Sequence, residues 1–222
     1  MGEDRHVLQD SLGRTEVKKA RAAKNLWRQG DAYDMRRAVM KFRASARKVR
    51  LHSVACCRFV AKHIRNPDSL ALIDLLERRA DDESLADAVS TLRRKVKRWA
   101  EGVGPFAQKI NWYARFAVWA STEPQPRAPV WGFSYRYDFR DILAEVLGPR
   151  GGTAPFLPEW RSDTAVSLAA HMYDSRDFSA MPILADALQD AGCDNGGVLD
   201  HCRGEGPHVR GCWVVDLVLG KA

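Results

Sequence analysis

The chain has 222 residues and a mass of 24.9 kDa, with 45% apolar and 28% charged residues. This composition is typical of a soluble globular protein and excludes a disordered or collagen-like chain. No stretch reaches the roughly 18 uninterrupted apolar residues of a transmembrane helix, and residues 1–6 lack the apolar core of a signal peptide. We therefore expect a cytoplasmic protein with no membrane partner.

The net charge of +7 is distributed unevenly along the chain. Residues 1–110 hold 25 Lys and Arg against 14 Asp and Glu, whereas residues 111–222 hold 10 against 14. The strongest imbalance lies in residues 14–50, where 13 basic residues face only three acidic ones. A basic segment of this density is typical of chains that bind phosphates or acidic partners.

The N-terminal part has helical periodicity. Residues 14–29, between Gly13 and Gly30, place small apolar residues and Trp27 at helical spacing, which predicts a basic helix with a thin apolar stripe. From Asp31 to Ile64 the apolar residues recur mostly at steps of three, four or seven. This pattern predicts one long amphipathic helix or two collinear ones; in the second case the break lies near Ser45.

Three more helices are predicted before the middle of the chain. The sequence Asn66-Pro67-Asp68 is a helix-start signal, and its helix should run to about Ala80. Residues 81–84 open a second helix that ends near Gly102. Residues 106–120 carry five aromatic side chains and predict a buried helix, with a stacking surface for bases or an apolar pocket as alternatives.

Residues 122–129 contain three prolines, which cannot continue a helix, so we expect a semi-extended connection and a domain boundary there. Short helices should follow: residues 136–147; a helix capped by Ser162 or Asp163 and running to about Asp174; one capped by Ser179 and stopped by Gly192; and one capped by Asp194 or Asn195 and running to about Arg203. The valine-rich run 212–219 fits a strand or a helix, and helical spacing favours the helix.

Together these patterns predict an all-α protein, an irregular helical bundle. We expect a basic helical region over residues 1–121, a proline-rich linker over 122–135 and a small acidic helical tail module over 136–222.

Two blocks of the sequence resemble a paralogous family of uncharacterised planctomycete proteins. The first is the block around Val-Ala-Cys-Cys-Arg at residues 54–58. The second is the tail, in which Met181-Pro-Ile-Leu-Ala-Asp-Ala-Leu-Gln-Asp-Ala-Gly-Cys-Asp-Asn is followed by His201-Cys-Arg-Gly and His208-Val-Arg-Gly-Cys-Trp-Val-Val-Asp-Leu-Val-Leu-Gly-Lys. The resemblance implies no particular activity, but it implies that all five cysteines lie in family-like motifs.

The five cysteines form a poor disulfide framework, because their number is odd and Cys56 is adjacent to Cys57, so we expect reduced thiols. Arg58 and Lys62 could activate one of these two thiols, but without a His partner a structural role is favoured. The fixed nucleotide-binding and hydrolase motifs are missing from the sequence. We therefore expect no enzymatic activity.

The tail concentrates thiols and imidazoles, the ligands that zinc prefers. Only His208 and Cys212 have the short spacing of a ligand pair, and the adjacent His201 and Cys202 would not normally both reach one ion. Buried thiols with surface or capping histidines are the favoured interpretation, so we expect no cofactor. The weaker alternative is a zinc site, and its candidate ligands are Cys193, Cys202, His208 and Cys212.

Acidic residues recur at helical spacing in two places, Asp138, Asp141 and Glu145 in one and Asp186 and Asp190 in the other. Such sets can hold a metal or do acid–base work, but solvated helix faces explain most of them.

The function best supported by the sequence is non-catalytic binding of a protein partner, with no small-molecule substrate indicated. The alternative is sequence-nonspecific binding of nucleic acid by the basic segment 14–50, in which basic helical faces would contact phosphates and Trp27 would stack on bases. The residues proposed for that role are Lys18, Lys19, Arg21, Lys24, Trp27, Arg28, Arg36, Arg37, Lys41, Arg43, Arg47, Lys48 and Arg50.

Overall fold

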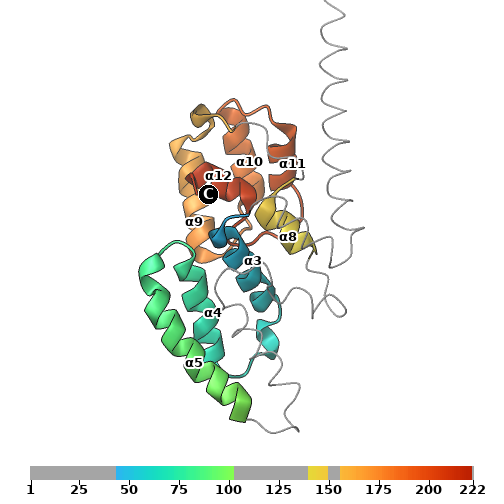
Figure 1. The fold of residues 1–222 in the computed structure, drawn as a ribbon. Helices are drawn as coiled ribbons and strands as arrows, with labels where there is room; N and C mark the ends of the chain where they lie inside the picture. The colour runs from blue at the N-terminus through green and yellow to red at the C-terminus, as the bar shows by residue number, and fades with distance from the viewer. Residues whose placement is uncertain (1–43, 103–139, 150–155, 222) are drawn as a thin grey trace, which may run out of the picture. The chain divides into compact units, whose positions relative to one another are not determined.

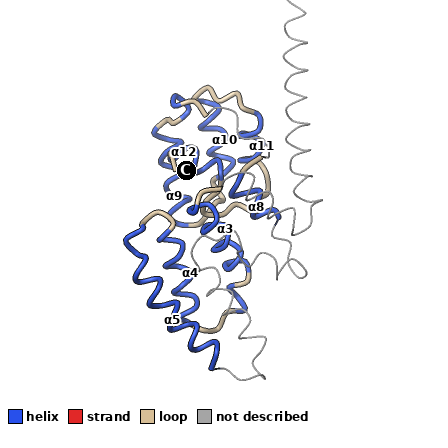
Figure 2. Tube along the Cα trace, in the orientation of Figure 1, coloured by secondary structure: helices blue, strands red, loops and turns tan. Residues whose placement is uncertain are grey.

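The structure is a computed structural model that describes residues 44–102, 140–149 and 156–221 (Figures 1 and 2). Within these residues every regular element is a helix, which confirms the all-α prediction. The helices predicted over 14–29 and 106–120 and the connection predicted over 122–129 lie outside the described residues.

The described residues fall into two compact units. One contains the described residues up to Ile142, and the other contains the described residues from Leu143 onward. The first includes helices α3, α4 and α5, and the second includes helices α9 to α12 together with the end of α8. The units are described separately below.

The first unit begins with α3 (Ala46–Phe59). Ser45 caps this helix, because its side chain accepts a hydrogen bond from the amide of Lys48 at 3.2 Å. A helix therefore starts after Ser45, as the break considered there requires, and the residues before 44 lie outside the described part of the chain. The helix ends earlier than the predicted Ile64, since a short 3₁₀ turn, Ala61–His63, follows it.

Helices α4 (Pro67–Arg79) and α5 (Ala86–Gly102) start and end close to their predicted positions. Asn66 caps α4 by accepting a hydrogen bond from the amide of Ser69 at 2.8 Å. Asp82 caps a 3₁₀ turn, Glu83–Leu85, that leads directly into α5. Both starts were predictable because a capping side chain acts on amides only two or three residues away.

Helix α4 packs against both α3 and α5. Its apolar face buries Leu72, Ile73 and Leu76. The partner helices bury residues of the same kind, chiefly Leu51 and Val54 of α3 and Val89 and Val96 of α5.

Ion pairs join these helices at the edge of the apolar core. Arg58 of α3 contacts Asp74 at 2.6 Å and Glu77 at 2.7 Å, both on α4. Lys95 of α5 contacts Asp68 of α4 at 2.8 Å. The carboxyl group of Glu77 is buried, so its pair with Arg58 satisfies a charge that burial would otherwise destabilise.

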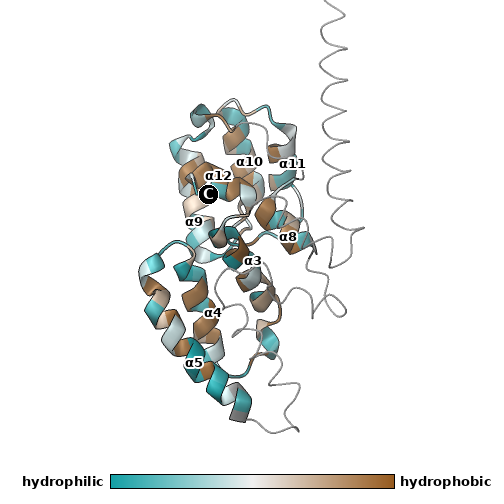
Figure 3. Ribbon diagram, in the orientation of Figure 1, coloured by the Kyte–Doolittle hydropathy of each residue, from teal (hydrophilic) through white to brown (hydrophobic). Residues whose placement is uncertain are grey.

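The second unit begins within α8 (Arg140–Leu147) and continues with α9 (Asp163–Ser175), α10 (Met181–Asp190), α11 (Gly196–Cys202) and α12 (Trp213–Leu219). Helix α9 packs against α10 and α12, and α11 packs against α10 and α12. Figure 3 shows the apolar character of α12, which supplies a large share of the core. The fully buried residues include Met172, Met181, Leu184, Leu188, Val214 and Val215.

The sequence located most helix boundaries of this unit. Ser162 caps α9, Asn195 caps α11, and Gly192 follows the end of α10 with a positive φ of 87°. Residues 213–219 form a helix, as predicted. The prediction that Ser179 caps α10 was wrong: that helix is preceded by Ala180, and no side chain caps it.

Gly148, which follows α8, takes a positive φ of 77° and lies against Trp213 of α12. A Cβ atom at this position would come within 3.1 Å of the indole ring. Glycine therefore permits the close approach between the end of α8 and the start of α12. None of the helices that the structure describes is both long enough and apolar enough to span a membrane.

Candidate metal centre and charged surfaces

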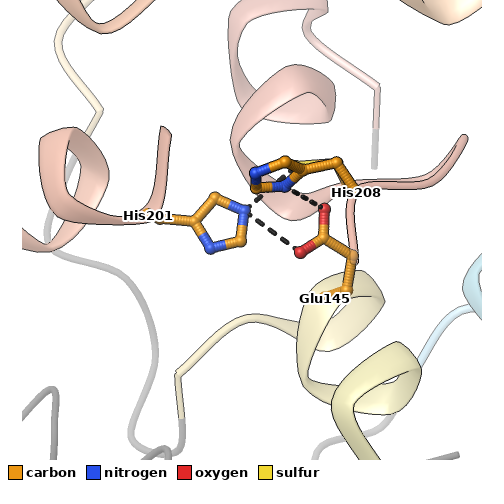
Figure 4. Close-up of side chains that lie close together, drawn as sticks. Glu145, His201 and His208 are labelled. Atoms are coloured by element: carbon orange, nitrogen blue, oxygen red, sulfur yellow. Dashed lines mark hydrogen bonds and ion pairs between the residues drawn. The ribbon is translucent and has the colours of Figure 1, made fainter. Parts of the chain in front are cut away.

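Four side chains that can ligate a metal come together inside the second unit: Glu145, His201, His208 and Cys212. They come from α8, from α11, from the loop after α11 and from the residue that precedes α12. One ligand atom from each lies within 4.8 Å of the others. Figure 4 shows the two imidazole rings directed at the carboxylate of Glu145.

The closest contacts involve one atom of each ring. Nδ1 of His208 lies 3.1 Å from Oε1 of Glu145, and Nε2 of His201 lies 3.3 Å from Oε2. The same Nε2 of His201 is 3.2 Å from Sγ of Cys212. His201 thus lies between the carboxylate and the thiol.

The other nitrogen of each ring also has a partner. Nε2 of His208 donates to the carbonyl of Gly204 at 3.0 Å. Nδ1 of His201 accepts a hydrogen bond from the indole Nε1 of Trp213 at 3.1 Å. Both rings are therefore held in orientation from outside the cluster.

The chain reaches this arrangement through a tight loop between α11 and α12. Gly206 has a positive φ of 91°, and a Cβ atom there would lie 2.6 Å from the amide nitrogen of His208. Only glycine fits such a position without a backbone shift. The turn returns His208 to the side of α8, where Glu145 lies.

Burial and charge act in opposite directions on Glu145. The side chain is 4% exposed, and burial alone raises the pKa of its carboxyl group, but the adjacent imidazoles of His201 and His208 outweigh burial and hold that pKa at about 2. For Cys212, burial and the nearby Glu145 carboxylate both raise the pKa of the thiol well above its usual value. In the absence of a metal, the cluster therefore contains a carboxylate and a thiol.

The cluster differs from the predicted zinc ligands. It contains His208 and Cys212 but not Cys193 or Cys202. Those two thiols lie in the apolar core of the unit, and burial raises the pKa of Cys202 to about 12. The adjacent residues His201 and Cys202 do not both enter the cluster, as expected. The one that does is His201, not the predicted Cys202.

Sequence reasoning missed Glu145, because its spacing from Asp141 predicted a solvated helix face. Glu145 is buried, whereas Asp186 and Asp190 are exposed as predicted. A signal was present in the sequence: Glu145 is flanked by Leu143, Val146 and the apolar Leu147. A carboxylate so close to core residues of a short helix needs an internal partner.

All five cysteines are buried as free thiols. Burial raises the pKa of Cys56 and of Cys57, which disfavours the thiolate form, although Nε2 of the buried His52 lies 3.6 Å from Sγ of Cys56. The favoured structural interpretation of Cys56 and Cys57 agrees with their positions in the core of the first unit.

Of the thirteen residues proposed to contact nucleic acid, the structure describes Arg47, Lys48 and Arg50; Lys18 to Arg43 lie outside the described residues. Arg47 pairs with Asp81 at 2.9 Å. Arg50 is buried and donates to the carbonyl of Arg79 and to Glu83, both at 3.1 Å. Both guanidinium groups have internal partners, so they are poorly placed to contact phosphate. Lys48 is half-buried.

A second basic surface lies on α5, where the sequence Arg93-Arg94-Lys95-Val96-Lys97-Arg98 places four exposed basic side chains. Two of them have acidic neighbours, since Lys95 contacts Asp68 and Lys97 contacts Glu101 at 3.8 Å. These basic residues are visible in the sequence, but the prediction chose residues 14–50, where the excess of basic over acidic residues is larger.

Comparisons of the chain with protein-family models, with curated proteins and with solved structures found no match.

Proposed function

We propose that the chain is a non-catalytic helical protein that binds a protein partner through the second unit, which holds α9 to α12 and is called the acidic C-terminal unit from here on. The observation that supports this proposal most is that the side chains of that unit best suited to catalysis are buried. Its thiols and Glu145 are buried, and Glu145 contacts two imidazoles inside the unit. These thiols and this carboxylate therefore do not face solvent, and the exposed surface of the unit is the part available for binding a partner.

That surface is acidic. Exposed carboxylates lie on three consecutive helices and their ends, at Asp163 and Asp174 of α9, Asp190 of α10, Asp194 and Asp200. One exposed ion pair, between Arg203 and Asp186 at 2.9 Å, joins α11 to α10. The complementary partner is a protein with a basic surface, because opposite potentials accelerate encounter and fix orientation.

Nucleic-acid binding is the second candidate, and the basic face of α5 favours it. Exposed lysines and arginines at this density release counterions when they contact a phosphate backbone. The basic residues at 14–43, which lie outside the described residues, would be a further source of positive charge. The acidic C-terminal unit would not contribute, because it repels phosphate.

Photo-crosslinking distinguishes the two candidates. A photoreactive residue is placed at Asp190 or Asp200 of the full chain, and at Arg94 as the matched control on α5. We expect a discrete protein adduct from the first two positions in the cells that produce the chain. The adduct should disappear when Asp194 and whichever of Asp190 and Asp200 does not hold the photoreactive residue are changed to Lys.

Nucleic-acid binding is measured on the same protein by fluorescence anisotropy with labelled double-stranded DNA and single-stranded RNA, at low and physiological salt. We expect no tight binding. Salt-sensitive affinity that is lost when Arg94 and Lys97, or Lys18, Lys19, Arg21 and Lys24, are changed to Glu would contradict the proposal and establish the second candidate.

A further inference from the structure

We infer that Glu145, His201, His208 and Cys212 form a structural zinc site. The four residue types are those that zinc takes in proteins, with bonds of about 2.0 to 2.3 Å. A tetrahedral ion with such bonds holds its ligand atoms roughly 3.3 to 3.6 Å apart. Contacts of 3.1, 3.2 and 3.3 Å among the four side chains are near these edges, but the first and last end on different oxygens of Glu145. One ligand atom from each residue lies within 4.8 Å of the others, so the four must draw together slightly to bind one ion.

The surroundings of His208 are those of a metal-bound histidine. A ligating imidazole usually donates its other N–H to a carbonyl or carboxylate, which fixes the ring orientation. His208 donates from Nε2 to the carbonyl of Gly204 and directs Nδ1 into the cluster. This contact is independent of the distances inside the cluster.

The ligand side chains of the site are largely buried. It has four protein ligands, and their side chains are at most 18% exposed for the two histidines and 4% exposed for Glu145. Structural zinc sites have four protein ligands, whereas catalytic sites keep a position for water. The arrangement therefore points to an ion that holds α8, α11 and α12 together.

The four side chains of the cluster have no net charge without the ion, and the same four side chains together with the ion have none either. Without zinc, His208 donates to a carbonyl from Nε2 and faces a carboxylate with Nδ1, so both its nitrogens carry protons and it offsets the charge of Glu145. Zn²⁺ displaces the Nδ1 proton of His208 and the thiol proton of Cys212. The ion, one carboxylate, one thiolate and two neutral imidazoles again carry no net charge.

One contact must change when the ion binds. An indole N–H can only donate, so Nδ1 of His201 bears no proton while it accepts from Trp213, and the proton is on Nε2. Ligation through Nε2 moves that proton to Nδ1. Trp213 then gives up its hydrogen bond to His201, and this bond competes with zinc.

The test is metal analysis of the full chain after purification without chelator, followed by removal of the metal and titration with Zn²⁺ or Co²⁺. We expect about one zinc per chain. Cobalt should give the visible spectrum of a tetrahedral site, with one thiolate-to-cobalt charge-transfer band. A folded wild-type chain that binds neither ion at one equivalent would overturn the inference, whatever the variants do.

The variants identify the ligands. Cys212→Ser should lose the charge-transfer band and weaken binding at least about tenfold, the lower end of the effect of perturbing a ligand's surroundings. Cys193→Ser and Cys202→Ser remove buried thiols of the same unit and should keep the metal, with circular dichroism to verify folding. Metal loss in these two folded controls, or retention in Cys212→Ser, would refute the assignment.

A substitution at Trp213 tests the competing contact. Trp213→Phe removes the indole donor and keeps an aromatic ring beside Gly148. We expect zinc affinity equal to or higher than that of the wild type, because His201 is then free to place its proton on Nδ1. Weaker binding by the folded variant would contradict the described proton shift.

Discussion

Glu145 is the residue on which the C-terminal unit depends most, because it is a buried carboxylate that contacts two imidazoles, of which His208 offsets its charge. In metal-free protein, we expect Glu145→Gln to lower the free energy of unfolding by about 3 to 5 kcal/mol, the usual cost of removing one partner of a buried pair. Urea unfolding followed by circular dichroism measures it. A loss below about 1 kcal/mol would show that the carboxylate is not an essential partner.

The stabilisation by Glu145 should depend on pH. Its folded-state pKa, about 2, lies below the ordinary value of 4.5, so the contribution is complete above pH 4.5 and is lost as pH falls toward 2. The unfolding free energies of wild type and Glu145→Gln should therefore converge as pH decreases from about 5 to about 2. Parallel curves over this range would contradict the ion pair.

The cysteines should be unreactive in the folded chain. All five are buried, and burial raises the pKa of each thiol, that of Cys202 to about 12. Because the thiolate is the reactive form, we expect no modification by a disulfide reagent at pH 8 and five modified thiols after unfolding. Cys193 is 3% exposed, more than the other four, so it is the first to examine by mass spectrometry if one thiol reacts in the folded chain.

At the scale of elements, the start of α4 depends on its cap. The side-chain oxygen of Asn66 accepts from both the amide and the hydroxyl of Ser69, at 2.8 and 3.0 Å, and the residue is buried. Asn66→Ala should reduce the unfolding free energy by about 1 to 2 kcal/mol, measured by chemical denaturation. Ser45→Ala, at the exposed cap of α3, is the matched control and should cost less.

The helix starts were predictable because a capping side chain acts on amides a few residues away. The errors, at Ser179 and at the metal cluster, arose where the deciding contact was a competing one or a distant one. Ser179 has a suitable side chain, but Asp177 accepts a hydrogen bond from its amide and α10 starts two residues later. The metal cluster was only half predicted, because His208 and Glu145 are 63 residues apart in the chain and no local pattern joins them. Helix periodicity assigned Glu145 to an exposed face, and only the packing of the unit reveals its two imidazole partners.

At the scale of the whole molecule, each unit carries its own apolar core. Leu76 is 1% exposed in the core that α3, α4 and α5 contribute to, and Leu188 is fully buried in the core around α9 to α12. Truncation of either leucine to Ala leaves a cavity and should cost about 2 to 5 kcal/mol. Because each unit is held together mainly by its own internal contacts, we expect each substitution to destabilise only the unit that contains it.

Amide hydrogen exchange measured by mass spectrometry shows where each loss acts. Leu188→Ala should speed exchange in α9, α10 and α12 and leave α3 and α4 at wild-type rates, and Leu76→Ala should give the reverse pattern. Zinc, if bound, should slow exchange in α11 and α12 of Leu188→Ala but not in α4 of Leu76→Ala, since all four ligands belong to the C-terminal unit. Faster exchange throughout both units in either variant would mean that the chain opens as one cooperative structure.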